Sequence, residues 1–478
     1  MSKYEPVIGI EIHVQLNTLT KAWCNCELKI NGFENHYVCE VCSAQPGTLP
    51  VVNKQAVDYA LMLGLATNCT INKTSYYDRK NYFYPDLPKG YQITQFKTPI
   101  CEDGLVEIGS ENGDSKKIRI ERIQLEEDTG KSTHYNDYSL INLNRAGTPL
   151  VEIVTKPDFE TAKEVTNFLK KIQSILVYLD VSKGNLQDGN MRCDVNLSLK
   201  PIGSKTLGTR TEVKNLNSFR SVERAIAHEK IRQASVLDKG DKVLQQTLLF
   251  DVDTGANRVL RTKSDADDYR YMPEPDLLAL SVTEGQIKKL KENLPELPTD
   301  KVERFIKEFN IPKYDAEVIC SEKKLANYFE KACSLHQGNA YKKISNWVMV
   351  ELLKLVNEAK ADIETLKLTP KHLVELVELI ESGKISGKIA KDIFVEVYDT
   401  GKYPSDIVTD KGLEQNSDTS EIEEIIKEII NAHPKEVAEL KSGRDRVMGF
   451  FVGQVMKKTQ GKANPKITSD LVSKLLEL

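Results

Sequence analysis

The sequence contains no run of 18 or more apolar residues, which is about the length that a membrane-spanning helix requires. A signal peptide is not expected either, because Glu11 and His13 interrupt the apolar residues near the start. Low-complexity tracts and long internal repeats are also missing. Apolar residues make up 40% and charged residues 28% of the chain, as is usual in soluble globular proteins. We therefore expect a cytoplasmic protein rather than a membrane, secreted or disordered one.

A strong excess of one charge is absent as well, because 66 Lys and Arg stand beside 70 Asp and Glu, for a formal net charge of −4. The charges are unevenly distributed, however. Residues 435–478 contain nine basic and five acidic side chains, so the rest of the chain is more acidic than the total suggests. Any basic surface that binds nucleic acid is therefore local, and the C-terminal residues are the candidate. The alternative is an ordinary solvated helix surface.

Nine cysteines are an odd number, and we expect them to be reduced thiols. Four of them form two close pairs, Cys24 with Cys26 and Cys39 with Cys42. Four thiolates at this spacing can close a tetrahedral zinc site that has no open position and would be structural. His36 could replace one thiolate, and the alternative is four cysteines without a metal.

A chain of 478 residues is long enough for roughly two to four domains. Residues 1–290 show period-two alternation and many turn residues, which is typical of strands, with two helices expected after residues 158 and 218. Prolines in residues 293–299 predict a linker, and helical periodicity follows it, with a looser linker at 400–420. The sequence therefore predicts an α+β protein with a large β-rich domain, a helical middle domain and a small helical tail.

Polar side chains alternate with apolar ones in four segments of the β-rich part. Residues 8–16 place Glu11 and His13 on one face of a strand, opposite a row of Ile, Val and Leu. Alternation slips near Glu121, which predicts a β-bulge there. The other three segments are 118–126 with Gln124 and Glu126, followed by Glu127 and Asp128; 191–198 with Arg192, Asp194 and Asn196; and 210–214 with Arg210, Glu212 and Lys214.

A solvated sheet face is the commoner meaning of such alternation in a single strand. The composition favours another interpretation, because these four faces gather Glu, Asp, His, Asn and Arg rather than Lys, Thr and Ser. If the sheet curves, the faces converge in one basin of carboxylates with cations around it. Carboxylate oxygens in that number suit Mg²⁺, and Mg²⁺ suits a nucleoside triphosphate whose phosphates Arg and Lys would contact.

Two loops mix cations with aromatic rings, at residues 78–91 and 267–276. Such a mixture can stack bases and neutralise phosphate, although the rings could equally plug the protein core. A P-loop is excluded, because residues 129–133 resemble its end but Leu125 stands where the earlier glycine belongs. A nucleotide site in this chain must then be built on the sheet.

Six segments carry long and distinctive motifs. They are VIGIEIHVQL (7–16), DRKNYFYPD (78–86), LEEDTGKS (125–132), LNRAGTPL (143–150), VKNLNS (213–218) and DYRYMPEPD (268–276). With these motifs the chain resembles, over essentially its whole length, the B/E family of aspartyl/glutamyl-tRNA(Asn/Gln) amidotransferase subunits. Nothing between residues 1 and 434 is similar to the domain inserted in E subunits, which favours the B branch. The four paired cysteines match the zinc ligands found in part of this family.

The resemblance implies a particular domain organisation. A cradle-like antiparallel β-sheet domain would occupy residues 1–293 and carry ATP, Mg²⁺ and a zinc-binding insertion at 24–42. An all-α helical domain would follow over 294–405. A small α-helical tail over 406–478, similar to the YqeY domain, would bind tRNA.

The resemblance also implies a two-step reaction. ATP phosphorylates the side-chain carboxylate of misacylated Glu-tRNA(Gln) or Asp-tRNA(Asn), and ammonia then displaces phosphate to give the amide. The serine-rich, lysine-dependent amidase signature is absent from this chain. A glutaminase A subunit and a small C subunit are therefore the implied partners in a heterotrimeric, glutamine-dependent carbon–nitrogen ligase, with an ammonia channel between the active sites. Which misacylated tRNA is processed depends on those that the cell makes.

The resemblance assigns roles to the polar residues. The predicted ligands or water-mediated partners of Mg²⁺ are Glu11, His13, Glu126 and Glu127, and Asp194 and Glu212 complete what we call the catalytic basin. The predicted phosphate- and substrate-binding residues are Arg192, Arg210, Lys214, Lys80 and Asn81. The predicted zinc ligands are Cys24, Cys26, Cys39 and Cys42.

Two other functions remain compatible with the same patterns. One is a zinc-stabilised tRNA-binding adaptor, in which the carboxylates form a solvated face and no ATP is turned over. The other is a sheet-based ATP-grasp or kinase enzyme that acts on a small carboxylate. The second would release ADP without tRNA, whereas the amidotransferase requires the misacylated tRNA.

Overall fold

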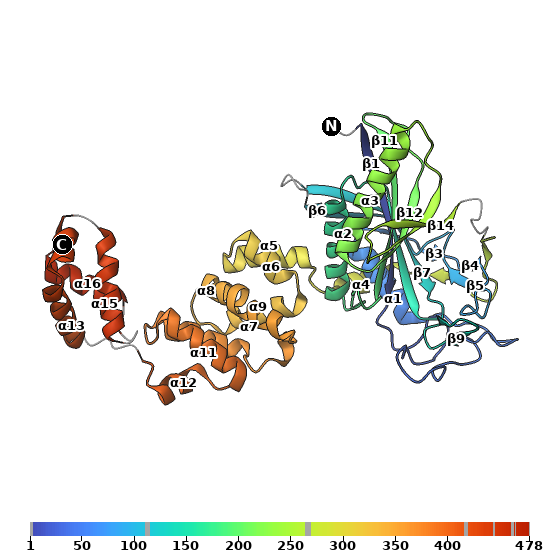
Figure 1. Ribbon diagram of the computed structural model, residues 1–478. Coiled ribbons are helices and arrows are strands. Elements are labelled where there is room, and N and C mark those ends of the chain that lie inside the picture. Colours follow the sequence, from blue (N-terminus) through green and yellow to red (C-terminus); the bar gives the residue numbers. More distant parts are fainter. Residues whose placement is uncertain are drawn as a thin grey trace. The chain divides into compact units, whose positions relative to one another are not determined.

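The computed structural model describes residues 3–109, 115–262, 269–414, 419–442, 445–459, 463 and 465–477 (Figure 1). The chain divides into two compact units, Met1–Leu297 and Pro298–Leu478. The boundary falls within the proline-containing segment 293–299 that the sequence predicts as a linker. Among the described residues, no helix combines the length and the apolar character needed to cross a membrane.

The first unit is built on a nine-stranded sheet whose centre is β1 (Tyr4–Gln15). The strand order is β14 (Asn257–Thr262), β13 (Gln246–Phe250), β12 (Thr211–Leu216), β11 (Met191–Pro201), β1, β10 (Pro149–Thr155), β7 (Ser115–Glu127), β6 (Cys101–Gly109) and β2 (Thr70–Ile71). Neighbouring strands are antiparallel except for β12 and β13, which are parallel. The sheet is thus antiparallel, as the resemblance implies, except at this pair. The helix α3 (Phe219–Asp238) joins the two strands, and a helical crossover produces parallel neighbours.

One face of the sheet is covered by α1 (Lys54–Ala66), α2 (Ala162–Tyr178) and α3 (Figure 1). Alternate residues of β1 enter this core, and Ile8, Ile10 and Ile12 are at most 1% exposed. The intervening residues Glu11 and His13 therefore occupy the opposite face, as the sequence pattern predicts. The helices thus cover the apolar face of the sheet and leave the opposite face to the polar side chains.

The helix α1 is missing from the sequence prediction, which expects two helices in this part of the chain. Asn53 caps α1 by accepting a hydrogen bond from the backbone N–H of Ala56. Seven of its thirteen residues are buried, so apolar side chains surround the helix and the amphipathic period is weak. A fourth helix, α4 (Glu284–Glu292), closes the first unit.

The predicted bulge in β7 is confirmed. Val154 of β10 pairs with Arg122, whereas the next residue, Thr155, pairs with Ile120. Glu121 is therefore the extra residue in β7. The slip sets the register in which Gln124 and Glu126 share one face with His13.

A second, three-stranded sheet packs against the end of β7. Its order is β15 (Met272–Pro273), β4 (Asp78–Asn81) and β5 (Tyr91–Thr94). Arg79 of β4 donates two hydrogen bonds to the buried carboxylate of Glu274, at 2.9 and 2.8 Å. This bidentate pair fixes β15 beside β4. Two shorter sheets pair β16 (Leu280–Ser281) with β3 (Thr74–Ser75) and β8 (Lys131–His134) with β9 (Ser139–Asn142).

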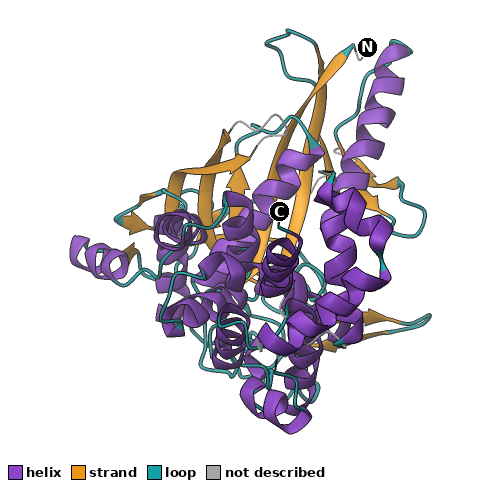
Figure 2. Cartoon of the chain, turned by 90° about the vertical axis from the view of Figure 1, so that its left-hand side faces the viewer, coloured by secondary structure: helices purple, strands orange, loops and turns teal. Residues whose placement is uncertain are grey.

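In the second unit, every element of the described residues is a helix (Figure 2, purple). One core joins α5 (Pro298–Phe309), α6 (Lys313–Cys320), α7 (Lys323–Leu335), α8 (Tyr341–Asn346), α9 (Leu353–Ala359), α10 (Pro370–Glu381), α11 (Gly387–Thr400) and α12 (Pro404–Lys411). A separate core joins α13 (Thr419–Ala432), α14 (Pro434–Lys441), α15 (Met448–Lys458) and α16 (Pro465–Leu476). Ile407 and Val408 belong to the first of these cores, so the last core begins later than the predicted boundary at residue 406.

Candidate active site and metal centre

The polar face of the large sheet brings together side chains that lie far apart in the sequence. In the register of the strands, His13 of β1 pairs with Arg192 of β11 on one side and with Glu152 of β10 on the other. Glu152 in turn pairs with Gln124 of β7. Directly paired residues of neighbouring strands share a face, so these four side chains form one row.

Three side chains of this face, which we call the carboxylate cluster, are His13, Glu126 and Glu152. One potential ligand atom of each lies within 4.8 Å of the others. His13 Nε2 is 3.6 Å from Glu126 Oε2 and 3.8 Å from Glu152 Oε1. Two carboxylates and an imidazole at these distances can share a cation.

Glu126 is held in place by three hydrogen-bond donors. Thr94 Oγ1 donates to Glu126 Oε1 at 2.7 Å, and Gln124 Nε2 donates to the same oxygen at 3.1 Å. Gln92 Nε2 donates to Glu126 Oε2 at 3.3 Å. Gln124 Nε2 also donates to Glu152 Oε2 at 2.6 Å, which ties the two carboxylates together. The donors come from β5 and β7, so the three-stranded and the nine-stranded sheet together position this carboxylate.

The charges of the cluster are strongly coupled. Burial would raise the pKa of Glu126, but the charges of Lys80 and His13 and the hydrogen-bond donors hold its pKa below the usual value. Burial and the neighbouring charge of Glu126 raise the pKa of Glu152 to about 7. The ammonium of Lys80 is desolvated as well, which would lower its pKa, yet the carboxylates of Glu126 and Glu152 raise it. The metal-free cluster therefore contains an ionised Glu126, a cationic Lys80 and a Glu152 that titrates near neutral pH.

Glu152 is the site residue that the sequence prediction misses. All seven residues of β10 are buried. Its sequence is therefore mostly apolar with a single glutamate, and polar and apolar residues do not alternate along it. A buried carboxylate is costly unless it is paired or binds a metal. That single acidic residue within an apolar strand was the available signal.

Glu127, a predicted Mg²⁺ ligand, does not join the carboxylate cluster. Consecutive residues of a strand point in opposite directions, so Glu127 faces away from Glu126. It accepts hydrogen bonds from Lys89 and, at 3.0 Å, from the backbone N–H of Ile93. With Lys89 it lines a cavity of about 200 Å³ that adjoins the cysteines. Of the two neighbouring glutamates predicted as Mg²⁺ ligands or water-mediated partners, the structure brings only Glu126 into the carboxylate cluster.

The other basin residues lie on the polar face in hydrogen-bonded and ion-paired groups of their own. Glu11 pairs across the strands with Asp194 and accepts a hydrogen bond from Asn196 Nδ2 at 2.9 Å. Lys214 Nζ lies 2.5 Å from Asp194 Oδ2 and 2.9 Å from Glu212 Oε1. The structure thus places these residues on the same face as the carboxylate cluster, one row further along.

Two predicted cations and one amide have different surroundings. Arg192 is paired with Asp128. Arg210 is exposed and precedes β12, so it is not part of the alternating strand. Asn81 Nδ2 donates to the backbone carbonyls of Tyr269, at 3.3 Å, and Arg270, at 2.8 Å. Asn81 therefore fixes the segment before β15. Of the other loop residues in the prediction, Asp267 and Asp268 lie outside the described residues.

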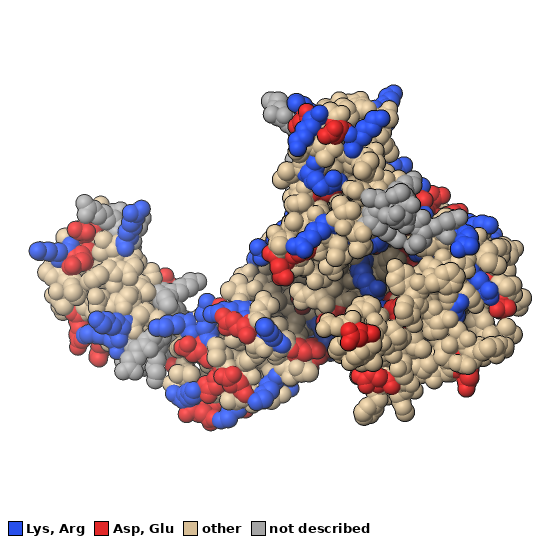
Figure 3. All heavy atoms as spheres, turned by 45° about the vertical axis from the view of Figure 1, so that its right-hand side comes forward, with Lys and Arg blue, Asp and Glu red and all other residues tan. Residues whose placement is uncertain are grey.

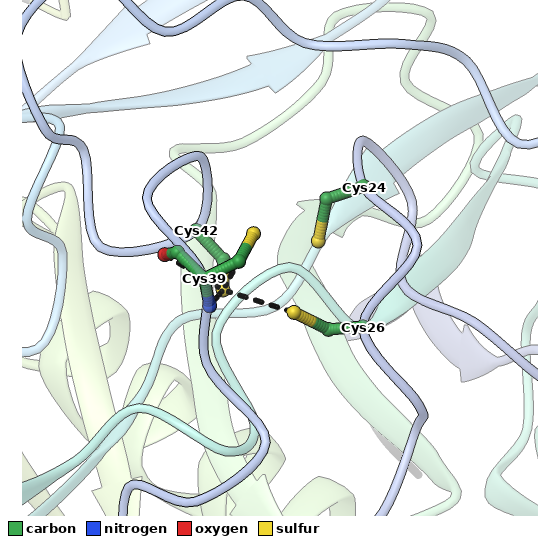
Figure 4. Close-up of side chains that lie close together, drawn as sticks. All are labelled: Cys24, Cys26, Cys39 and Cys42. Atoms are coloured by element: carbon green, nitrogen blue, oxygen red, sulfur yellow. Dashed lines mark hydrogen bonds between the residues drawn. The ribbon is translucent and has the colours of Figure 1, made fainter.

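The four paired cysteines converge as the second potential metal site in the described part of the chain. Their sulfur atoms all lie within 4.8 Å of one another. Figure 4 shows Cys24 and Cys26 on one loop facing Cys39 and Cys42 on another. The sulfur of Cys42 is 3.9 Å from that of Cys26 and 4.0 Å from that of Cys39. Tetrahedral zinc with bonds of about 2.3 Å would place its sulfur ligands about 3.8 Å apart, so the donors fit zinc.

Lys21 is an unusual neighbour of these sulfurs. Its side chain is fully buried, and Nζ lies 3.0 Å from the carbonyl of Leu143 and 3.5 Å from Cys42 Sγ. The Cys24 thiol, the backbone N–H of Cys39 and the charge of Lys21 hold the pKa of Cys42 well below its usual value. A buried ammonium is stable only beside negative charge, and thiolates at the cysteine site would supply that charge to Lys21.

We expect about one zinc ion per chain and its loss from Cys39→Ser, because three thiolates no longer close the site. Lys21→Met should weaken zinc binding at least tenfold, because it removes the cation beside Cys42. Competition with a chromophoric chelator measures both effects. Lys29→Met, at an exposed lysine paired with Glu27, is the matched control and should bind zinc normally. Metal-free protein from a preparation without chelator, or an unchanged affinity in Lys21→Met, would contradict these expectations.

Comparison with protein families identifies the class to which this fold and site belong. The model of the GatB/GatE catalytic domain matches residues 6–288, and the model of the GatB domain matches residues 327–476. The chain therefore belongs to the GatB/GatE family, as its motifs indicate. The second match starts within α7, so it extends well before the tail from residue 406 that the sequence likens to the YqeY domain.

Full-length relatives place the chain more narrowly. The B subunit of the aspartyl/glutamyl-tRNA(Asn/Gln) amidotransferase of Thermodesulfovibrio yellowstonii is 50% identical over 476 residues, which cover 99% of this chain and 100% of that protein. The B subunit from Persephonella marina is 48% identical, with the same coverage. That from Thermoanaerobacter pseudethanolicus is 49% identical, with 99% of each chain covered. Within the family, the similarity is thus to B subunits of amidotransferases.

Proposed function

We propose that this chain is the tRNA-binding, ATP-using B subunit of a glutamine-dependent amidotransferase. It would phosphorylate the side-chain carboxylate of Glu-tRNA(Gln), Asp-tRNA(Asn) or both, and complete the amide with ammonia from a glutaminase partner. The observation that carries the proposal is the carboxylate cluster, where His13, Glu126 and Glu152 meet beside the desolvated ammonium of Lys80. The names of the full-length relatives support the same substrate class.

The cluster suits phosphoryl transfer to a carboxylate. A carboxylate is a poor electrophile, and its activation requires a γ-phosphate to approach an anion, so charge neutralisation and positioning are the main tasks. Mg²⁺, when bound by the cluster, would supply that neutralisation for the phosphates of ATP. His13, Glu126 and Glu152 fit as its ligands because the atoms of all three already converge. Lys80 would then hold the oxygens of the substrate carboxylate or the transferred phosphoryl group.

The neighbouring ion pairs would serve the rest of the nucleotide. Lys214 lies between Asp194 and Glu212, which fix its ammonium on the polar face. Arg192 is fixed by Asp128 on the same face. Cations that are held in this way are suited to phosphate contacts. Glu11, next to His13 on this face, would contact the hydrated cation through water.

The remaining parts of the chain receive supporting roles in this proposal. The sheet domain, residues 1–293, is the catalytic cradle, and the cysteine site stabilises its loop with zinc. The helices that share the first core of the second unit, α5 to α12, connect it to a tRNA-binding tail formed by α13 to α16. On the face of the second unit shown in Figure 3, basic and acidic side chains are interspersed. Because the described residues of this face show no large area of positive charge alone, the tail would contact the tRNA phosphates through small local groups of basic side chains. The protein would act in the cytoplasm, with A and C subunits in a heterotrimer.

The test is amide formation by the chain assembled with its A and C subunits. We expect Glu-tRNA(Gln), Asp-tRNA(Asn) or both to be amidated, and ADP to form only when ATP, Mg²⁺ and misacylated tRNA are present. Equal ADP release without tRNA would support an enzyme of small carboxylates instead. Absence of ADP formation in an assembly that binds tRNA would support an adaptor.

Mg²⁺ binding should depend on pH because of Glu152. Its pKa of about 7 in the metal-free protein means that Mg²⁺ must displace a proton at lower pH. The Mg²⁺ affinity should therefore rise about tenfold per pH unit up to pH ~7 and level off above it. Calorimetric titrations between pH 5.5 and 8.5 measure this dependence. Glu152→Gln should bind Mg²⁺ weakly at every pH, and an affinity of the wild type that does not change with pH would contradict the assignment.

A further inference from the structure

A row of aromatic rings, which we call the aromatic strip, borders the carboxylate cluster. It consists of Tyr84, Tyr82, Tyr269, Tyr271 and Phe96. Successive ring centroids are 5.9, 6.0, 6.0 and 4.1 Å apart. The rings come from the loop after β4, the segment before β15 and the residues after β5. All of them except Phe96 belong to the two cation-and-aromatic loops of the sequence, where base stacking and core packing are both compatible with the pattern.

The middle of the strip is linked to the proposed reaction site. Tyr82 Oη donates to Gln92 Oε1 at 3.1 Å, and Gln92 is one of the donors to Glu126. Lys80 Nζ, the cation of the cluster, lies 4.9 Å from the ring centroid of Tyr269. A molecule that follows the strip therefore passes directly beside the cluster.

The strip ends at Tyr84, which is 60% exposed, and the neighbouring ring of Phe83, outside the strip, is 80% exposed. With Pro85, Pro88 and Lys89 these two rings line an open hollow. The Phe83 ring lies on the backbone of Gly90, where an added Cβ would approach it to 3.1 Å. These rings do not plug a core, so the core-packing interpretation does not hold for them.

The loop that presents these rings is fixed rather than free. The backbone N–H of Leu87 donates to the carbonyl of Tyr84 at 3.0 Å, and that of Gly130 donates to the carbonyl of Asp86 at 2.8 Å. Leu87 is buried beneath the loop. Large apolar rings that a well-anchored loop holds in solvent are typical of a binding surface.

We propose that Phe83 and Tyr84 stack the unpaired terminal nucleoside of the aminoacylated tRNA, an inference that rests on the proposed function. Only the amino acid and one ribose separate the reacting side-chain carboxylate from the terminal base. With the carboxylate beside Glu126 and Lys80, the base must lie a short distance away, and the exposed rings next to Tyr82 are in that position. Aromatic rings with nearby cations bind single-stranded nucleic acid in this way, independently of base identity.

The test uses the assembled enzyme and steady-state amide formation at varied concentrations of Glu-tRNA(Gln). Phe83→Ala and Tyr84→Ala should each raise the KM for tRNA about tenfold, and the double variant more, with kcat and the KM for ATP within about twofold of the wild type. Phe83→Tyr and Tyr84→Phe should restore the KM, because they keep the rings. Tyr135→Ala with Tyr138→Ala removes another exposed, stacked pair and is the matched control, with no expected change.

A competition experiment isolates the terminal base. Uncharged tRNA should compete more strongly than tRNA that lacks its terminal nucleotide against wild-type enzyme, and the two should compete equally against the double variant. An unchanged KM in active alanine variants would overturn the stacking proposal while the proposed function stands. Loss of assembly with the partner subunits in these variants would also overturn it, because the rings would then form a protein interface. A wild-type assembly that does not amidate tRNA would instead contradict the proposed function.

Discussion

Glu126→Gln should lower tRNA-dependent ADP formation about 1,000-fold in the assembled enzyme. Glu126 is the ionised carboxylate at the centre of the cluster, and the substitution removes its charge while the size of the side chain is kept. In the wild type, Thr94 and Gln124 donate hydrogen bonds to Glu126 Oε1. The amide oxygen of the glutamine in the variant can still accept these two hydrogen bonds. The fold and the affinity for tRNA should therefore survive, as measured by thermal unfolding and filter binding.

The control for this variant is Glu107→Gln, at an exposed glutamate on β6 of the same sheet. It should leave ADP formation unchanged. Parallel loss of tRNA binding and ADP formation in Glu126→Gln would indicate an adaptor or a folding defect. Retained ADP formation would show that the carboxylate cluster is not where phosphoryl transfer occurs.

Lys80→Met should lower ADP formation at least 100-fold without weakening Mg²⁺ binding. The ammonium of Lys80 is the main positive charge that holds the pKa of the buried Glu126 low. A cation so close to two carboxylates also repels Mg²⁺, so its removal should leave the affinity for Mg²⁺ equal or higher. ADP formation should thus fall, whereas the Mg²⁺ affinity measured by calorimetry should stay equal or increase.

Lys80→Arg keeps the charge and should retain part of the activity, whereas Lys97→Met changes an exposed lysine near the same small sheet and should be neutral. If Mg²⁺ affinity fell together with activity in Lys80→Met, Lys80 would be a structural support of the metal site rather than a group that contacts the substrate. Full activity in Lys80→Met would exclude both roles.

Much of the polar face could be predicted because a half-buried strand has a visible period. Glu11 and His13 alternate with buried isoleucines, and the positions of both residues follow from that pattern alone. Glu152 could not be found in this way, because β10 is buried on both faces and shows no alternation. The placement of Glu127 outside the carboxylate cluster also follows from the period of a strand, because consecutive residues point to opposite faces.

The cysteine site illustrates the same limit. Short spacings within Cys24–Cys26 and Cys39–Cys42 predict two ligand pairs, and the convergence of the sulfurs agrees with that prediction. Lys21 carries no such signal, because its neighbours Leu143 and Cys42 come from distant parts of the chain. Likewise the parallel pairing of β12 and β13 depends on where α3 returns the chain to the sheet, which local periodicity does not encode.

The most direct test of the account is the position of a divalent cation in crystals of the assembly soaked with Mn²⁺, a substitute for Mg²⁺ that scatters anomalously. We predict an anomalous peak bonded to His13 Nε2 and to carboxylate oxygens of Glu126 and Glu152. A peak beside Glu127 and Lys89 or between Asp194 and Glu212, with none at the carboxylate cluster, would contradict the central claim that these three residues form the metal site.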